Sequence, residues 1–165
     1  MNESLHNLIE ALREELKQCG EMLALLDQQQ DLVMLRQTSG LLQVVAAINA
    51  QSETLQAVRL EREQRRRHLA RTLLLDQDCS FKELIPRLDA NCRPLVQALV
   101  QENNELLIRI QQRARQNHLL LSRAVELMQR FIDSILPGSG PATYSGDGQV
   151  LAGVLTQHKL YDAVG

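Results

Sequence analysis

The chain has 165 residues, of which 31 are Leu and 18 are Gln, whereas its aromatic side chains are limited to two Phe and two Tyr. Its formal net charge of −2 gives no overall attraction to nucleic acid or to an anionic membrane surface. The most apolar stretch, residues 41–50, is interrupted by Gln43 and Asn49 and is too short to cross a bilayer. These features disfavour nucleic acid and direct membrane insertion, and we expect a soluble cytoplasmic protein built from long helices.

The three cysteines, Cys19, Cys79 and Cys92, are an odd number without a Cys-x-x-Cys spacing. Neither a disulfide framework nor a zinc module fits this pattern, so free thiols in a reducing compartment are expected. No nucleophile with its base and no set of metal ligands stands out along the chain. The sequence therefore predicts a protein that is not an enzyme and carries no cofactor or metal.

The first element expected from the N-terminus is a long helix over about residues 3–37. Apolar residues alternate at steps of four and three from Leu5 to Val33, with one polar break at Gln30, which is typical of a coiled-coil seam. Thr38-Ser39-Gly40 combines residues that favour helix ends, so we expect the chain to reverse there. A second helix is predicted over about residues 41–75.

The link that follows contains Ser80-x-x-Glu83, a capping-box sequence that predicts a short helix over about residues 81–85, before Pro86. A third long helix is predicted over about residues 92–136, because apolar steps of three and four resume after Pro94. Residues 137–148 then contain four Gly and two Pro. This composition predicts a flexible tail over residues 137–165. Its apolar side chains between residues 150 and 161 would order only on binding.

Three long helices joined by short turns can bury their apolar seams only by lying side by side. The predicted fold is therefore all-α: an elongated antiparallel bundle of three long helices plus one short helix over residues 1–136, followed by the flexible tail. Gln30 and Asn117 are polar residues on the seams, and we interpret them as devices that fix the alignment of the helices.

Six arginines lie between residues 59 and 71, against only two glutamates, Glu61 and Glu63. A solvated helix face with ion pairs such as Glu63–Arg67 is the favoured interpretation. A docking surface for an acidic or amphipathic protein segment is the second, with Arg59, Arg62 and Arg66 as its candidates. Nucleic acid is the least favoured, because the segment has no aromatic side chain on which a base could stack.

The order of these parts, together with two motifs, resembles one protein family. The third long helix carries Arg115-Gln116-Asn117-His118-Leu119-Leu120-Leu121, and the tail carries Thr143-Tyr144-Ser145-Gly146-Asp147-Gly148. Two Leu- and Gln-rich helices, a capped link and a third helix with these motifs resemble the FlgN family of flagellar type III export chaperones. Members often have two Asn three residues apart, whereas this chain has Ala114 before Asn117.

The resemblance implies a cytoplasmic chaperone that binds the amphipathic C-terminal helices of hook–filament junction (hook-associated) proteins, prevents their premature association and delivers them to the cytosolic domain of the export gate. The expected cargo groove lies on the third long helix, with Leu106, Ile110, Asn117, Leu120, Leu127 and Phe131 as candidates. Tyr144 is the candidate for docking at the gate. The alternative is a self-associating structural coiled coil without export cargo, and a homodimer is possible in either case.

Overall fold

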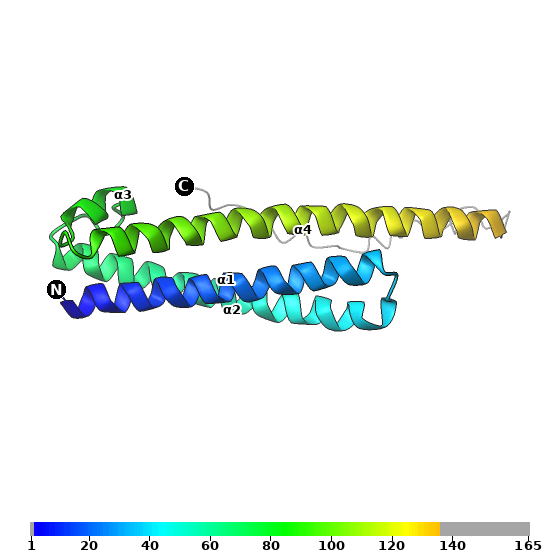
Figure 1. Cartoon of the computed structure of the whole chain (residues 1–165), viewed down its shortest axis with the longest axis horizontal. Coiled ribbons are helices and arrows are strands. Elements are labelled where there is room, and N and C mark those ends of the chain that lie inside the picture. The colour runs from blue at the N-terminus through cyan, green and yellow to red at the C-terminus, as the bar shows by residue number, and fades with distance from the viewer. Residues whose placement is uncertain (1, 136–165) are drawn as a thin grey trace, which may run out of the picture. The chain divides into compact units, whose positions relative to one another are not determined.

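The computed structural model describes residues 2–135, and every regular element in this range is helical (Figure 1). This confirms the all-α prediction. The predicted tail over residues 137–165 lies outside the described residues, so its separation from the bundle stays a prediction. The elements are α1 (Asn2–Met34), α2 (Thr38–Thr72), α3 (Phe81–Leu84), the 3-10 helix η1 (Ile85–Arg87) and α4 (Arg93–Ile135).

The chain divides into two compact units, Met1–Val125 and Glu126–Gly165. The first unit holds α1, α2, α3, η1 and most of α4, and α1 and α2 form its closest helix pair. The second unit begins with the last turns of α4. None of the helices in the described range is long and apolar enough to cross a membrane.

The connection between α1 and α2 differs from the sequence-based prediction. The chain reverses at residues 35–37, so Thr38-Ser39-Gly40 forms the first turn of α2 instead of the connecting turn. Gly40 is helical and serves a different purpose, since a Cβ atom there would lie 3.3 Å from both Cδ atoms of Leu32. Glycine thus permits the close approach of α2 to the last turns of α1. The predicted bounds, 3–37 and 41–75, end or begin about three residues too late.

Both α1 and α2 end in a Schellman motif whose left-handed residue is not glycine. Arg36 has φ 56° and Leu74 has φ 57°. Across these residues, the Gln37 N–H donates to the Leu32 carbonyl and the Leu75 N–H donates to the Ala70 carbonyl, both at 2.9 Å. Glycine is the usual residue at this position, and for that reason the sequence-based prediction placed the turn at Gly40.

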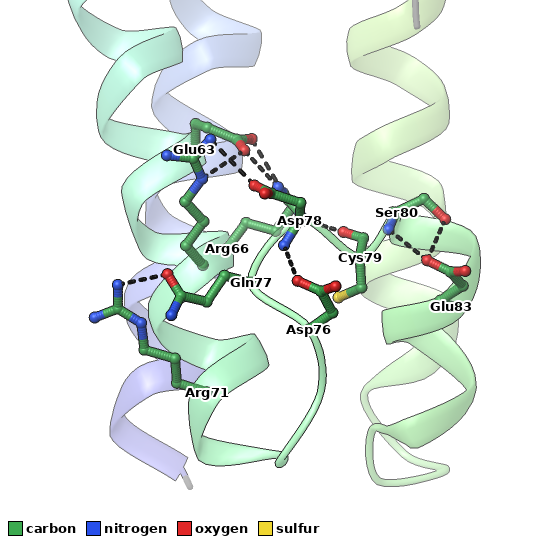
Figure 2. Close-up of polar contacts among 10 residues, drawn as sticks. Glu63, Arg66, Arg71, Asp76, Gln77, Asp78, Cys79, Ser80 and Glu83 are labelled. Atoms are coloured by element: carbon green, nitrogen blue, oxygen red, sulfur yellow. Dashed lines mark hydrogen bonds and ion pairs between the residues drawn. The ribbon is translucent and has the colours of Figure 1, made fainter.

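The short helix after α2 begins at the predicted capping box. The Ser80 backbone N–H donates to Glu83 Oε2 at 2.7 Å, which satisfies a donor at the helix start (Figure 2). Helix α3 continues directly into η1, in which Pro86 occupies a first-turn position that needs no backbone donor.

The apolar core of the first unit lies where the N-terminal half of α1, the end of α2, the short helices and the start of α4 meet. Its most deeply buried leucines and valine are Leu8, Leu12, Leu69, Leu84 and Val96. Farther along the α1–α2 pair, Met22, Leu26 and Val44 are also buried, and a polar contact joins the two helices. Gln51 of α2 donates its side-chain amide to Gln18 of α1, at 2.7 Å to Oε1 and at 3.0 Å to the backbone carbonyl.

Candidate functional site

Two buried asparagines define the seam on which α4 meets α1. Asn103 and Asn117 are each only 2% exposed. Asn103 donates Nδ2 to the Leu12 carbonyl at 2.9 Å, and Asn117 donates Nδ2 to the Leu26 carbonyl at 2.7 Å. Each pair is separated by 91 residues, so α4 runs parallel to α1 in one fixed register. This geometry agrees with the interpretation of Asn117 as an alignment residue, and Asn103 plays the same part without having been predicted.

Gln30, the polar break predicted in the first seam, also contacts α4. Arg113 of α4 donates Nη1 to Gln30 Oε1, and its Nε lies 2.7 Å from Asp27 Oδ1. The Arg113 side chain is one third exposed, so this ion pair lies at the edge of the α1–α4 seam. A polar group on each side therefore supports the register that the two asparagines set.

The six candidate cargo residues all lie on α4, but their environments differ. Asn117 is buried, whereas Leu106, Ile110 and Leu120 are half-buried. Leu127 and Phe131 are 65% and 63% exposed. The six therefore do not form one open surface, and the exposure of their apolar groups is greatest toward the C-terminal end of α4.

The first arginines of the basic segment contact a buried carboxylate on α1. The Glu15 side chain is fully buried, with Arg59 Nε 3.5 Å from one of its oxygens and Arg62 Nη1 3.4 Å from the other. Burial raises the pKa of Glu15, and the positive charges of Arg62 and Arg59 oppose this rise. Burial and the neighbouring Glu15 together raise the pKa of the Cys19 thiol to about 11, so this thiol is a poor nucleophile.

The later arginines hold the connection between α2 and α3 (Figure 2). Arg66 is buried and donates Nη1 to the Cys79 carbonyl and Nε to Glu63 Oε2, the latter at 3.0 Å. The hydrogen bond from Arg66 lowers the pKa of Glu63. The predicted Glu63–Arg67 ion pair is present at 3.3 Å. Arg71 reaches the connection itself, donating Nη2 to Gln77 Oε1 at 2.7 Å.

The three arginines predicted to dock an acidic segment, Arg59, Arg62 and Arg66, already contact other residues of the same chain. Arg62 also lies over the Phe81 ring, 5.8 Å from its centroid, where a cation is attracted by the ring face. All three guanidinium groups are thus engaged with α1, with Glu63 or with the α2–α3 connection. The docking of an acidic segment at these residues stays a prediction. The arginines would have to give up their present contacts within the chain in order to bind such a segment.

The comparison with known protein families decides the assignment. A sequence model described as FlgN protein matches residues 1–152, which include every helix described above. The chain belongs to the FlgN family. This is a family of flagellar export chaperones, and the general role of the chain follows from its membership. No curated protein and no solved structure matches the chain at a significant level.

The FlgN match also includes a group of exposed apolar side chains at the end of α4. We define the terminal apolar face as Leu127, Met128, Phe131, Ile132 and Ile135, which are between 41% and 65% exposed and belong to the unit Glu126–Gly165. Sequence reasoning named only Leu127 and Phe131. The adjacent row of Met128, Ile132 and Ile135 repeats at steps of four and three, and this spacing was the signal that could have identified it.

Within the range 2–135, no three His, Cys, Asp or Glu side chains are grouped so that they could hold a metal ion. The three cysteines carry free thiols. The described part of this FlgN-family chain presents an apolar helix face at one end of α4.

Proposed function

We propose that this FlgN-family chain binds the amphipathic C-terminal helices of hook–filament junction proteins in the cytoplasm, prevents their premature association and delivers them to the cytosolic domain of the export gate. The observation that supports cargo binding is the terminal apolar face. Five large apolar side chains on one short stretch of helix are the anchors that an incoming amphipathic helix requires.

The energetic argument is that a cargo helix would remove these side chains from water. Burying a large apolar side chain fully contributes about 1.5–3 kcal/mol, so Leu127 and Phe131 alone provide a substantial driving force. Leu120, Ile110 and Leu106 belong to the first unit, where they are half-buried, and they stay secondary cargo candidates. Asn117 is buried in the α1–α4 seam, so its part in cargo binding would be to hold that seam in register.

The proposed gate contact involves Tyr144, which lies outside the described residues. A Gly- and Pro-rich linker lets a side chain reach a partner, and tyrosine provides apolar area and a hydroxyl group at a low cost in side-chain entropy. Cargo and gate would then bind different parts of the chain, so the chaperone could dock at the gate while it holds its cargo.

The test of cargo binding is co-expression with candidate junction proteins, followed by size-exclusion chromatography with mass measurement. The expected result is a complex that Leu127→Asp with Phe131→Asp abolishes, while Ser134→Asp on the same helix leaves it intact. Both apolar residues are largely exposed, so the double variant should melt like the wild type. A wild-type chain that forms large assemblies of its own and retains no junction protein would favour the scaffold alternative.

Calorimetry distinguishes cargo binding at the terminal apolar face from cargo binding at the arginines. Burial of apolar area gives a negative heat-capacity change and an affinity that changes little with salt. Contacts with Arg59, Arg62 and Arg66 would instead weaken steeply as salt screens them. A steep salt dependence with an unchanged heat capacity would therefore place the cargo on the arginines rather than on the end of α4.

A further inference from the structure

The terminal apolar face and one segment of the tail share the same spacing of apolar residues. On α4, Leu127, Met128, Phe131 and Ile132 occupy positions i, i+1, i+4 and i+5 of an exposed helix face. In the tail, Val150, Leu151, Val154 and Leu155 have the identical spacing. We propose that residues 150–161 of this chain cover its own terminal apolar face when no cargo is bound.

The matched spacing has a simple packing consequence. Positions i, i+1, i+4 and i+5 form two adjacent rows on a helix, so a segment that becomes helical on contact could set its two rows against the two rows of α4. Residues 150–157 contain no charged side chain. This part of the segment, which holds the four matched apolar residues, can therefore lie beside Glu126, Arg130 and Asp133 without placing like charges together, and Lys159 follows it as the one charged residue among 150–161.

The linker has the length that this contact requires. Fourteen residues, 136–149, separate the last described residue from the segment. A flexible chain of that length has a root-mean-square end-to-end distance of about 20 Å. The helical stretch from Leu127 to Ile135 is only about 12 Å long at 1.5 Å per residue. The segment thus reaches any part of the face without stretching its linker.

The same tether favours this segment over a second copy of the chain as the occupant. A short flexible linker holds its segment at an effective concentration in the millimolar range. A helix this short is marginal alone in water, but a contact whose dissociation constant is about one tenth of that effective concentration is nine-tenths populated. Another molecule would reach such a level only in a very concentrated solution.

Covering the face has a consequence for cargo, and this part rests on the proposed function. If the segment occupies the face for nine-tenths of the time, the apparent cargo affinity is lowered about tenfold, because only the open fraction binds. A junction protein would have to displace the segment. Displacement would open the loop that contains Tyr144 at the moment of loading.

The test uses the absence of tryptophan from the chain. A full-length Met128→Trp reporter places one indole on the terminal apolar face, and its emission and quenching by acrylamide measure how far the face is covered. The tail is then altered by Leu151→Asp with Leu155→Asp. Ala163→Asp with Val164→Asp adds the same two charges outside the matched segment and serves as the control.

The expected result is blue-shifted emission with quenching reduced several-fold in the reporter and in its control. The Leu151→Asp, Leu155→Asp variant should show red-shifted, freely quenched emission. Phe131→Trp is the second reporter if Met128→Trp alters the helical circular dichroism signal. Freely quenched emission with an intact tail would overturn the proposal, as would covering that grows with protein concentration, which would indicate a second copy.

A cargo titration separates this inference from the proposed function. With an intact cargo site, Leu151→Asp with Leu155→Asp should tighten binding of a junction protein about tenfold. The variant could show red-shifted, freely quenched emission and still bind cargo with unchanged affinity. That result would overturn the proposed competition between the tail segment and the cargo. Failure of every variant to bind any junction protein would overturn the cargo role while leaving the fluorescence result for the covered face in place.

Discussion

Asn103 and Asn117 stand two heptads apart on α4, and each donates its side-chain amide to the α1 carbonyl that lies 91 residues earlier in the chain. A shift of α4 by one turn would break both bonds at once. The Oδ1 atoms of both residues are buried and accept no hydrogen bond from the described part of the chain. An unpaired buried acceptor costs about 1–3 kcal/mol, so this register is obtained at some expense in stability.

The first prediction concerns the chemistry of this seam. Asn117→Asp replaces the donor with a carboxylate facing the Leu26 carbonyl and Gln29 Oε1, which are both acceptors. We expect a loss of about 2–4 kcal/mol in the free energy of unfolding at neutral pH, since an unpaired buried charge is strongly unfavourable. Chemical denaturation measures it. Gln116→Glu makes the same change at an exposed neighbour, and equal losses in the two variants would contradict the buried role of Asn117.

The second prediction follows from the raised pKa of Glu15. The folded state holds the Glu15 proton more tightly than the unfolded state, so this group lowers the free energy of unfolding as the pH rises above its ordinary value of 4.5. Glu15→Gln removes that dependence. The stability of Glu15→Gln relative to wild type should therefore increase with pH from about 4.5 up to the raised pKa and then level off.

The size of this effect depends on the difference in proton affinity. Each tenfold difference in the proton affinity of Glu15 between the folded and unfolded states changes the free energy of unfolding by about 1.4 kcal/mol. Denaturation at a series of pH values measures the relative stability. Glu21 is exposed, so Glu21→Gln should run parallel to wild type at every pH. A Glu15→Gln curve that is also parallel would mean that Arg59 and Arg62 fully compensate the burial of the carboxylate.

The third prediction compares two adjacent arginines. Arg66 is buried against the Cys79 carbonyl, whereas the neighbouring Arg65 pairs with Glu61 on the surface. Arg66→Gln should destabilise the chain by about 3 kcal/mol, because it breaks a buried charged contact and leaves the α2–α3 connection unsupported. Arg65→Gln should cost less than about 1 kcal/mol. Thermal melts of the two variants provide the comparison. Equal losses of stability in Arg66→Gln and Arg65→Gln would contradict the structural role of Arg66.

The spacing of apolar residues predicted the long helices of this chain, and the capping box at Ser80 predicted α3. The spacing was least informative at the helix ends. Apolar steps such as Leu5, Leu12 and Leu26 of α1 identify a long helix because only a helix brings those side chains to one face. The ends depend on single backbone positions. Arg36 and Leu74 adopt left-handed φ values that their residue types rarely take, so no composition signal marked the two turns.

The arginine segment shows why side-chain environment was harder to predict than helical structure. Only five residues of α2 are buried, and Arg66 is one of them. Without a clear apolar face, the sequence of α2 does not indicate which arginines point toward α1 or toward the α2–α3 connection. The buried carbonyl of Cys79 that receives Arg66 lies thirteen residues later and becomes a partner only through the fold. Asn103 lies four residues after Leu99 and three before Leu106, so the spacing that placed Asn117 on the seam could also have identified Asn103.

The last prediction separates cargo binding from gate docking. Tyr144 belongs to the Gly- and Pro-rich segment that follows α4 in the sequence. Tyr144→Ala should therefore leave the helical fold and the cargo affinity unchanged. An anchoring aromatic contributes at least about 2 kcal/mol to a small interface, so its loss should weaken gate binding roughly thirtyfold. The measurement is a titration of the cargo-loaded chaperone against the cytosolic domain of the export gate. Tyr161→Ala is the matched control, because it removes the other tyrosine of the tail and should bind the gate like wild type. Equal gate binding by Tyr144→Ala and wild type would reject the docking role, and a lowered melting temperature for Tyr144→Ala would instead assign the ring to packing against the helices.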